Sequence, residues 1–179
     1  MLARLIPDRH FPTYRALTPA VLAEDGVRAL LLDIDNTLAP YEVAEPDDEL
    51  RAWFAALAAA GIGVALVSNN HRDRVELFNR TLGLPAYPDA HKPLRRTVRR
   101  ALDELGVPPA EAAFMGDQLF TDVLAGKNLG MRAYTVPPIR DKRDPFTRFK
   151  RLLERPFMHA YRRRERNQSK EKKHDTRKR

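Results

Sequence analysis

Short apolar blocks separated by amphipathic stretches run through most of this chain and predict alternating strands and helices. Leu30–Asp33 is apolar almost to its end, which is typical of a strand buried on both faces of a parallel sheet. Segments 62–70 and 112–117 have the same character and also end in polar residues. Segment 84–93 predicts a brief strand and loop, and 131–138 a last strand.

The stretches between these strands have helical spacing. Segment 47–61 carries acidic residues in its first turn and a glycine at its end, both typical of helix boundaries. Segments 71–83 and 118–130 also end in glycine, and 93–106 opens with a proline, whose missing N–H is harmless there. This alternation predicts an α/β protein with a Rossmann-like open parallel sheet and helices on both faces.

Polar residues follow several of the predicted strands directly. Because ligands bind beyond the carboxyl ends of parallel strands, we expect these side chains to gather at one edge of the sheet. Two carboxylates in a poorly solvated cleft raise each other's pKa, so this arrangement calls for a cation between them. The residues concerned are Asp33 and Asp35, Ser68 and Asn69, Asp117, and Lys92 in the loop before a later helix.

Composition narrows the classes of protein that remain. The 179 residues contain no cysteine, which excludes a disulfide framework, a thiolate nucleophile and a cysteine-based zinc site. No apolar run reaches the roughly 20 residues that span a bilayer, and the N-terminus lacks a signal-peptide core. We therefore expect a cytoplasmic protein that could be peripheral at the inner membrane face.

The net charge of +8 is unevenly distributed along the chain. Residues 140–179 hold 17 Lys+Arg and 6 Asp+Glu, a balance of +11, which leaves 15 and 18 in residues 1–139, a balance of −3. An acidic body thus precedes a basic tail. Any argument from charge to an anionic partner concerns the tail.

Four motifs in order carry a resemblance to a known family: DIDNT at 33–37, SNN at 68–70, HKP at 91–93 and GDQLFTD at 116–122. Together they resemble the haloacid dehalogenase (HAD) superfamily of aspartate-dependent phosphatases. Within it the chain is similar to subfamily IIIA, the YqeG-type phosphatases, which are related to the mitochondrial phosphatidylglycerophosphatase of yeast. The resemblance implies a HAD fold, Mg²⁺ as the cofactor and hydrolysis through an aspartyl-phosphate.

The resemblance also implies roles for individual residues. Asp33 would be the nucleophile, Asp35 the general acid and base, and Lys92 the group that compensates charge in the transition state. Mg²⁺ would be held by the side chains of Asp33 and Asp117 and the backbone carbonyl of Asp35. Ser68 and the Asn69 N–H would bind phosphoryl oxygens. Asp122 would orient Lys92 or a metal-bound water, and Thr37 would stabilise the loop.

Each of these residues has a plainer interpretation when it is taken alone. A pair of aspartates can line a solvated turn, Ser68 can end a strand, Lys92 can be a surface lysine and Asp122 can lie on an exposed helix face. Asn70 is a further candidate for substrate contact. His71 is expected to cap a helix or face solvent, and His91 beside Lys92 is a weak catalytic candidate.

The spacing of the motifs leaves no room for a separate cap domain. Only a short flap, 39–47, precedes the first long helix, and 68–92 has room for one helix and one strand. We expect a cap-less enzyme with an open cleft, which suits a substrate that is large or held in a membrane, protein or nucleic acid.

The chain divides into a phosphatase domain at 1–143, a basic amphipathic helical extension at 144–166 and a disordered basic tail at 167–179. The extension has apolar residues at helical spacing, and Pro156 is expected to break or kink its helix. Its apolar stripe could lie on anionic lipid or pack on the body. The stripe consists of Phe146, Phe149, Leu152, Leu153, Phe157 and Tyr161.

Two classes of function follow from these features. The first is a Mg²⁺-dependent phosphatase acting on phosphatidylglycerophosphate to give phosphatidylglycerol, with the tail on the anionic membrane; the same enzyme could act instead on a phosphoprotein, nucleotide or sugar phosphate. The second is an RNA- or ribosome-binding protein that uses the tail. The tail has little of the aromatic and basic interleaving that favours base stacking.

Overall fold

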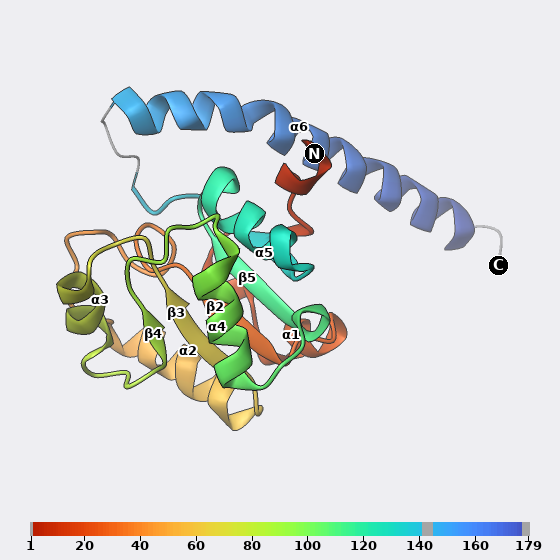
Figure 1. Cartoon of the computed structure of the whole chain (residues 1–179). Helices are drawn as coiled ribbons and strands as arrows, with labels where there is room; N and C mark the ends of the chain where they lie inside the picture. The colour runs from red at the N-terminus through yellow and green to blue at the C-terminus, as the bar shows by residue number, and fades with distance from the viewer. Residues whose placement is uncertain (1, 141–144, 177–179) are drawn as a thin grey trace.

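A single parallel sheet forms the centre of the computed structural model, which describes residues 2–140 and 145–176 (Figure 1). Its six strands lie in the order β1-β6-β5-β2-β3-β4, and every neighbouring pair is parallel. The strands are β1 (Arg9–His10), β2 (Ala29–Leu32), β3 (Gly63–Val67), β4 (Ala86–Tyr87), β5 (Ala112–Gly116) and β6 (Arg132–Thr135).

Six α-helices and four shorter helical turns connect and cover the strands. The α-helices are α1 (Pro19–Glu24), α2 (Asp48–Ala59), α3 (Arg72–Asn79), α4 (Arg95–Leu105), α5 (Leu124–Leu129) and α6 (Pro145–Thr176). The shorter turns are the 3-10 helices η1 (Leu2–Leu5), η2 (Tyr14–Ala16) and η3 (Pro109–Glu111), and the π-helical turn η4 (Leu119–Val123).

Alternate residues of the central strand β2 build two separate cores. Leu30 and Leu32 pack in a cluster with buried residues of α1, α2 and α3 on one face of the sheet. Ala29 and Leu31 pack in a second cluster with buried residues of α4 and α5 on the other face. Helices therefore cover both faces of the sheet, and the predicted Rossmann-like α/β fold is confirmed.

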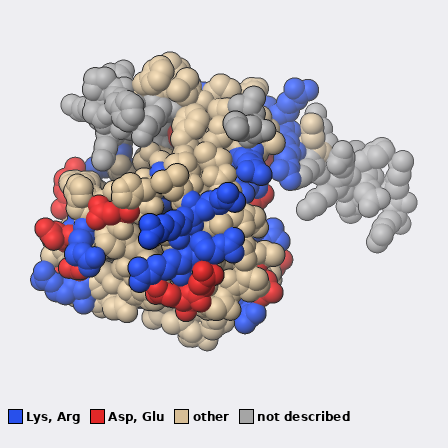
Figure 2. Space-filling model, viewed as in Figure 1, with Lys and Arg blue, Asp and Glu red and all other residues tan. Residues whose placement is uncertain are grey.

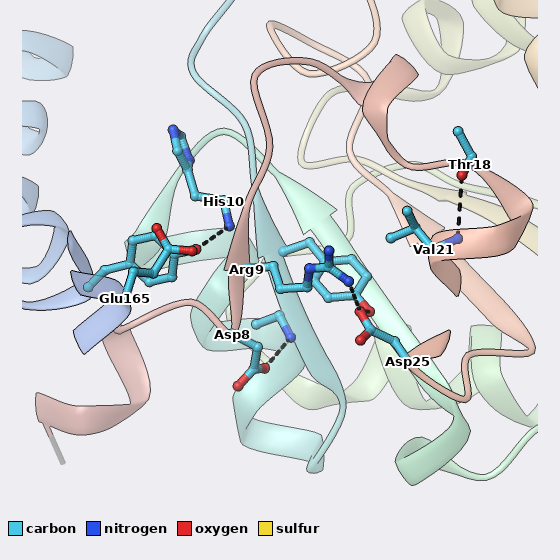
Figure 3. Close-up of polar contacts among 10 residues, drawn as sticks. Asp8, Arg9, His10, Thr18, Val21, Asp25 and Glu165 are labelled. Atoms are coloured by element: carbon cyan, nitrogen blue, oxygen red, sulfur yellow. Dashed lines mark hydrogen bonds and ion pairs between the residues drawn. The ribbon is translucent and has the colours of Figure 1, made fainter. Parts of the chain in front are cut away.

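The edge strand β1 was not predicted, because it is only two residues long and lies in a polar segment. It is held largely by groups around it rather than by its own hydrophobicity. Asp8 Oδ2 accepts a hydrogen bond from Ala133 N at 2.7 Å, and Arg9 pairs with Asp25 at 3.0 Å, as Figure 3 shows. These bonds fix β1 beside β6 and tie it to the end of α1.

The C-terminal helix α6 departs from the sequence prediction in two ways. Pro156 donates no backbone hydrogen bond, yet the helix continues past it, so the prediction of a break there is wrong; residues 167–176 are helical where the sequence predicted a disordered tail. Residues 177–179 lie outside the described residues. Proline has a helix-compatible φ, and the Arg, Lys, Glu and Gln that dominate 162–173 are good helix formers, so high charge does not prevent a helix there.

Part of α6 packs on the body of the protein. Tyr161 is buried, its Oη accepts a hydrogen bond from His10 N at 3.0 Å, and Phe157 lies edge-on to Phe120. Phe149, Leu152 and Leu153 are exposed, and the side chain of Phe146 lies outside the described residues. The apolar stripe is thus divided between the body and solvent. Among the described helices, none combines the length and apolarity needed to cross a membrane.

Candidate active site

The carboxyl edge of the sheet brings together a buried lysine and three buried aspartates from the segments after β2, β4 and β5. Asp33 follows β2, Asp117 follows β5 and Lys92 lies between β4 and α4. Lys92 Nζ lies 2.8 Å from Asp33 Oδ1 and 2.8 Å from Asp122 Oδ1, and these three side chains are almost fully buried. The predicted gathering of these residues at one edge is therefore observed.

Asp122 reaches this cluster from a π-helical turn after β5, which is wider than an α-helical turn. In the π-helical turn η4, Asp122 Oδ2 accepts a hydrogen bond from Gln118 N at 3.0 Å, while Oδ1 faces Lys92. The carboxylate rests against Gly116, where an added Cβ would lie 2.2 Å from Asp122 Cγ. Gly116 is therefore part of the site, because only a residue without a side chain leaves room for the carboxylate.

A Gly116→Ala variant is expected to push Asp122 out of contact with Lys92. Overpacking of this kind costs about 1–3 kcal/mol of unfolding free energy, and phosphate release should fall as well. Urea unfolding and a turnover assay would measure both effects. Gly63→Ala in β3 is the matched control, because its Cβ would meet nothing closer than Leu105 Cδ2 at 3.4 Å. Equal losses in the two variants would contradict the interpretation.

The loop after β3 positions Lys92 from the backbone side. Asn69 Oδ1 accepts from Lys92 N at 2.6 Å, and Asn69 Nδ2 donates to the Lys92 carbonyl at 3.1 Å. Ser68 is buried, and its Oγ accepts from Asn70 N at 3.1 Å, which leaves the hydroxyl with its own proton to donate. The Asn69 side chain thus has a positioning role that the sequence did not predict, in addition to the role expected of its N–H.

Asp35 lies in a separate polar group beside this cluster. Arg74 donates to Asp35 Oδ1 from Nε at 3.2 Å and from Nη2 at 3.0 Å, while Asn70 Nδ2 donates to Oδ2 at 2.9 Å. Arg74 is itself largely buried, with its guanidinium 5.3 Å from the Phe78 ring centre. Both oxygens of Asp35 are therefore held by residues that follow β3. The sequence did not predict the contact between Asp35 and Arg74.

The environment of the cluster shifts the pKa values of its two most tightly coupled members. Burial raises the pKa of Asp33 to about 8, Lys92 opposes this shift, and the nearby carboxylates of Asp122 and Asp117 add to it. Burial alone would lower the pKa of Lys92, but the carboxylates of Asp122 and Asp33 outweigh it and raise that pKa. Lys92 is therefore a fixed positive charge at neutral pH.

The cluster fits a divalent cation. Asp33, Asp117 and Asp122 each offer a carboxylate oxygen, and these atoms lie within 4.8 Å of one another. With Lys92 charged, the four groups carry a formal charge of −2 when all three carboxylates are ionised, and a hard divalent ion with oxygen ligands would offset it. Both oxygens of Asp122 already contact Lys92 Nζ or Gln118 N, which suits a supporting place for Asp122 rather than direct binding of the ion.

The remaining candidates take supporting places. Thr37 is buried in the loop after β2, and its N–H donates to the Ile34 carbonyl at 3.2 Å, consistent with a loop-stabilising role. His71 is the exposed N-cap of α3 and lies 3.1 Å from Asp89. His91 is exposed, and its Nδ1 lies close to the Asp89 carbonyl. The described residues between Ser68 and Lys92 form only α3 and β4, as the cap-less prediction requires.

Comparisons with known proteins agree with this geometry. A family model for haloacid dehalogenase-like hydrolases matches residues 16–130. The chain is 34% identical over 158 residues, 88% of its length, to 92% of the probable phosphatase YqeG of Bacillus subtilis. It is 26% identical over 149 residues, 78% of its length, to 54% of the chloroplastic phosphatidylglycerophosphate phosphatase 1 of Chlamydomonas reinhardtii.

Two solved structures share the fold at low sequence identity. A hypothetical protein, XCC2798, from Xanthomonas campestris aligns with a TM-score of 0.53 and 23% identity over 72% of this chain and 76% of that one. The cobalt-bound deoxy-D-mannose-octulosonate 8-phosphate phosphatase of Haemophilus influenzae aligns with a TM-score of 0.52 and 12% identity over 76% and 90%.

Proposed function

The chain belongs to the haloacid dehalogenase-like hydrolases and is a phosphatase, and from this premise we propose that it hydrolyses phosphatidylglycerophosphate to phosphatidylglycerol with Mg²⁺, through a phosphorylated Asp33. The observation that carries the chemical part of the proposal is the bridging of Asp33 and Asp122 by Lys92 Nζ at 2.8 Å from each carboxylate. This contact supports the proposal, because it sets a fixed cation beside the carboxylate that would be the nucleophile.

The residues of the cluster would divide the chemistry between them. A free Asp33 oxygen attacks phosphorus, and Lys92 offsets the negative charge that develops on the transferring phosphoryl group. Ser68 Oγ and the Asn69 N–H donate to the phosphoryl oxygens. Mg²⁺, held by Asp33 and Asp117 with the Asp35 carbonyl, would neutralise the dianionic ester so that a carboxylate can approach it.

Asp35 would act as the general acid and base. It protonates the leaving oxygen, and it then activates the water that hydrolyses the phosphorylated Asp33. Arg74 and Asn70 hold both oxygens of its carboxylate, so its position is fixed before substrate arrives. Oδ1 accepts both Arg74 bonds, whereas Oδ2 accepts one bond from Asn70 and keeps a lone pair that can hold the transferred proton.

Three observations support a lipid as the substrate. One relative is named as a phosphatidylglycerophosphate phosphatase, although this chain spans 54% of it. The structure between Ser68 and Lys92 has no cap among its described residues, so a large headgroup can reach Asp33. The basic chain from Arg140 would hold the enzyme on an anionic membrane, at the inner face of the cell membrane.

A phosphate-release screen tests this function. Phosphatidylglycerophosphate in vesicles, a sugar phosphate, a nucleotide and a phosphopeptide are assayed with Mg²⁺ and again with EDTA. We expect release from the lipid to be fastest and to fall at least about 10³-fold when the ion is removed, since it neutralises charge at the reacting centre. Faster turnover of a soluble ester would reject the lipid, and turnover in EDTA would reject the metal-dependent mechanism.

A further inference from the structure

Seven large apolar side chains are exposed among the described residues. They lie in only two parts of the structure. Four lie in segments that follow strands β2, β4 and β6, and three lie in the first half of α6. The first set, here called the mouth rim, consists of Tyr41, Val43, Leu94 and Ile139; the second consists of Phe149, Leu152 and Leu153. Scattered exposed side chains are ordinary, but this segregation to one end is not.

Contacts place most of the mouth rim beside the candidate active site. Ile139 N donates to the carbonyl of Asn36, in the loop of Asp33 and Asp35, at 3.0 Å. The Tyr41 ring centre lies 5.9 Å from the guanidinium carbon of Arg74, which binds Asp35. Leu94, the most exposed at 63%, is two residues beyond Lys92. Three of the four rim residues therefore lie beside segments that carry residues of the candidate active site.

The exposed side chains of α6 lie at the same end of the molecule. Glu154 is buried and accepts a hydrogen bond from Leu119 N, two residues after Asp117, at 2.8 Å. Phe149 is five residues before Glu154, which is about 8 Å along a helix. In Figure 1 this half of α6 lies on the side of the body that carries α5.

Basic side chains adjoin the mouth rim. Figure 2 shows Lys and Arg gathered over α4, whose first turn follows Leu94. Arg95, Arg96 and Arg99 are exposed and form no ion pair with the described part of the chain, so their charge is available to a partner. The flap carries acidic residues, but Glu42 lies 3.7 Å from Arg140, which offsets its charge.

A hollow of about 580 Å³ lies between the start of α3 and α4. Arg72, His91, Arg96 and Arg100 contribute to its lining, and its acids Asp89 and Glu104 already contact His71 and Arg100. Its size falls within the range of small-molecule sites. Beside the mouth rim, it suits the anionic headgroup of a neighbouring lipid.

We propose that the mouth rim and the arginines Arg95, Arg96 and Arg99 of α4 dock on an anionic phospholipid bilayer, so that the opening to Asp33 faces the membrane. Apolar side chains bordered by arginine match the interface of such a bilayer. The apolar side chains insert between the lipids, and the arginines contact the anionic headgroups. The bilayer then supplies the cover that a cap domain would supply. This proposal rests on the proposed lipid substrate. It adds the catalytic face to the tail as a second part of the membrane contact.

Vesicle sedimentation of the full chain tests the docking surface. Two variants change the surface and leave α6 intact: Leu94→Ser/Ile139→Ser and Arg95→Glu/Arg96→Glu. We expect each to weaken partition to phosphatidylcholine–phosphatidylglycerol vesicles at least about tenfold, and the wild type to bind pure phosphatidylcholine weakly. Arg80→Glu/Arg132→Glu is the matched control, with the same change of charge at exposed residues at the end of α3 and the start of β6.

Turnover distinguishes this proposal from the proposed function. All variants should hydrolyse p-nitrophenyl phosphate with Mg²⁺ at the wild-type rate, which also shows that they fold, while release from phosphatidylglycerophosphate in vesicles should fall with partition. Unchanged partition in the rim variant or in the arginine variant, or an equal loss in the control, would overturn the docking surface. So would RNA that binds the same arginines and displaces the vesicles. Lost partition in a protein that never cleaves the lipid would keep the surface and reject the substrate.

Discussion

Replacing Asp33 by Asn is expected to lower phosphate release on the order of 10⁴-fold or more, because the amide oxygen is a very poor nucleophile toward phosphorus. The substitution keeps the size of the side chain and an oxygen that can accept from Lys92 Nζ, now 2.8 Å away. The fold should therefore persist. Steady-state kinetics with a soluble phosphomonoester would measure the loss, and circular dichroism would check the fold.

Stability provides a second readout for the same variant. The pKa of Asp33 is raised from 3.8 to about 8 in the folded, metal-free protein. A folded state that holds its proton more tightly than the unfolded state loses stability as pH rises between those two values. In EDTA the wild type should therefore lose stability across this window, whereas Asp33→Asn, which cannot ionise, should lose less. Unfolding in urea near each end of the window measures the difference.

Asp103→Asn serves as the control for both readouts, because Asp103 is exposed on α4 away from the site. It should change neither turnover nor the pH dependence of unfolding. Retained turnover in Asp33→Asn would remove Asp33 from the role of nucleophile, whatever the effect on stability.

The layout of the site was predictable because two simple features coincide in this chain. Buried strands such as Leu30–Leu32 are apolar on both faces, and the polar residues that end the strands must meet at one edge of a parallel sheet. Asp33, Ser68 and Asp117 follow strands directly, so topology alone brings them together. Lys92 could be added because of its motif.

The supporting contacts were harder to predict, since each depends on how two distant segments pack. Arg74 lies 39 residues from its partner Asp35 and, in a helix with many charges, looks like any surface arginine. Gly116 ends a strand, where a glycine has no special meaning until the Asp122 carboxylate is seen against it. The role of the Asn69 side chain depends in the same way on the path of the chain at Lys92.

The errors at the two ends of the chain have different causes. The two-residue strand β1 is stabilised by backbone pairing with β6 and by side chains outside it, so its own sequence carries little strand signal. The charged segment from 167 was expected to be disordered because it contains nothing to bury. Its residues nevertheless have high helix propensity and extend a helix that Glu154 and Tyr161 already anchor to the body.

Replacing Lys92 by Met is expected to have a large effect on both stability and activity. Met has a similar length but no charge, so Asp33 and Asp122 would remain buried without the ammonium that now lies 2.8 Å from each. Removing one partner of a buried ion pair costs about 3–5 kcal/mol of unfolding free energy. Loss of a fixed charge that stabilises the transition state costs a further drop in turnover of about 10³-fold.

The double variant Lys92→Met/Asp122→Asn separates the two effects. It removes one of the uncompensated carboxylates, so urea unfolding should show that part of the lost stability returns, whereas turnover should stay as low as in Lys92→Met. Lys127→Met, which breaks a more exposed ion pair with Asp8, should cost no more than about 1 kcal/mol and leave turnover unchanged. If the double variant is less stable than Lys92→Met, like-charge repulsion between Asp33 and Asp122 is not what Lys92 suppresses. If Lys92→Met retains turnover, the charge that assists phosphoryl transfer must come from the divalent ion alone.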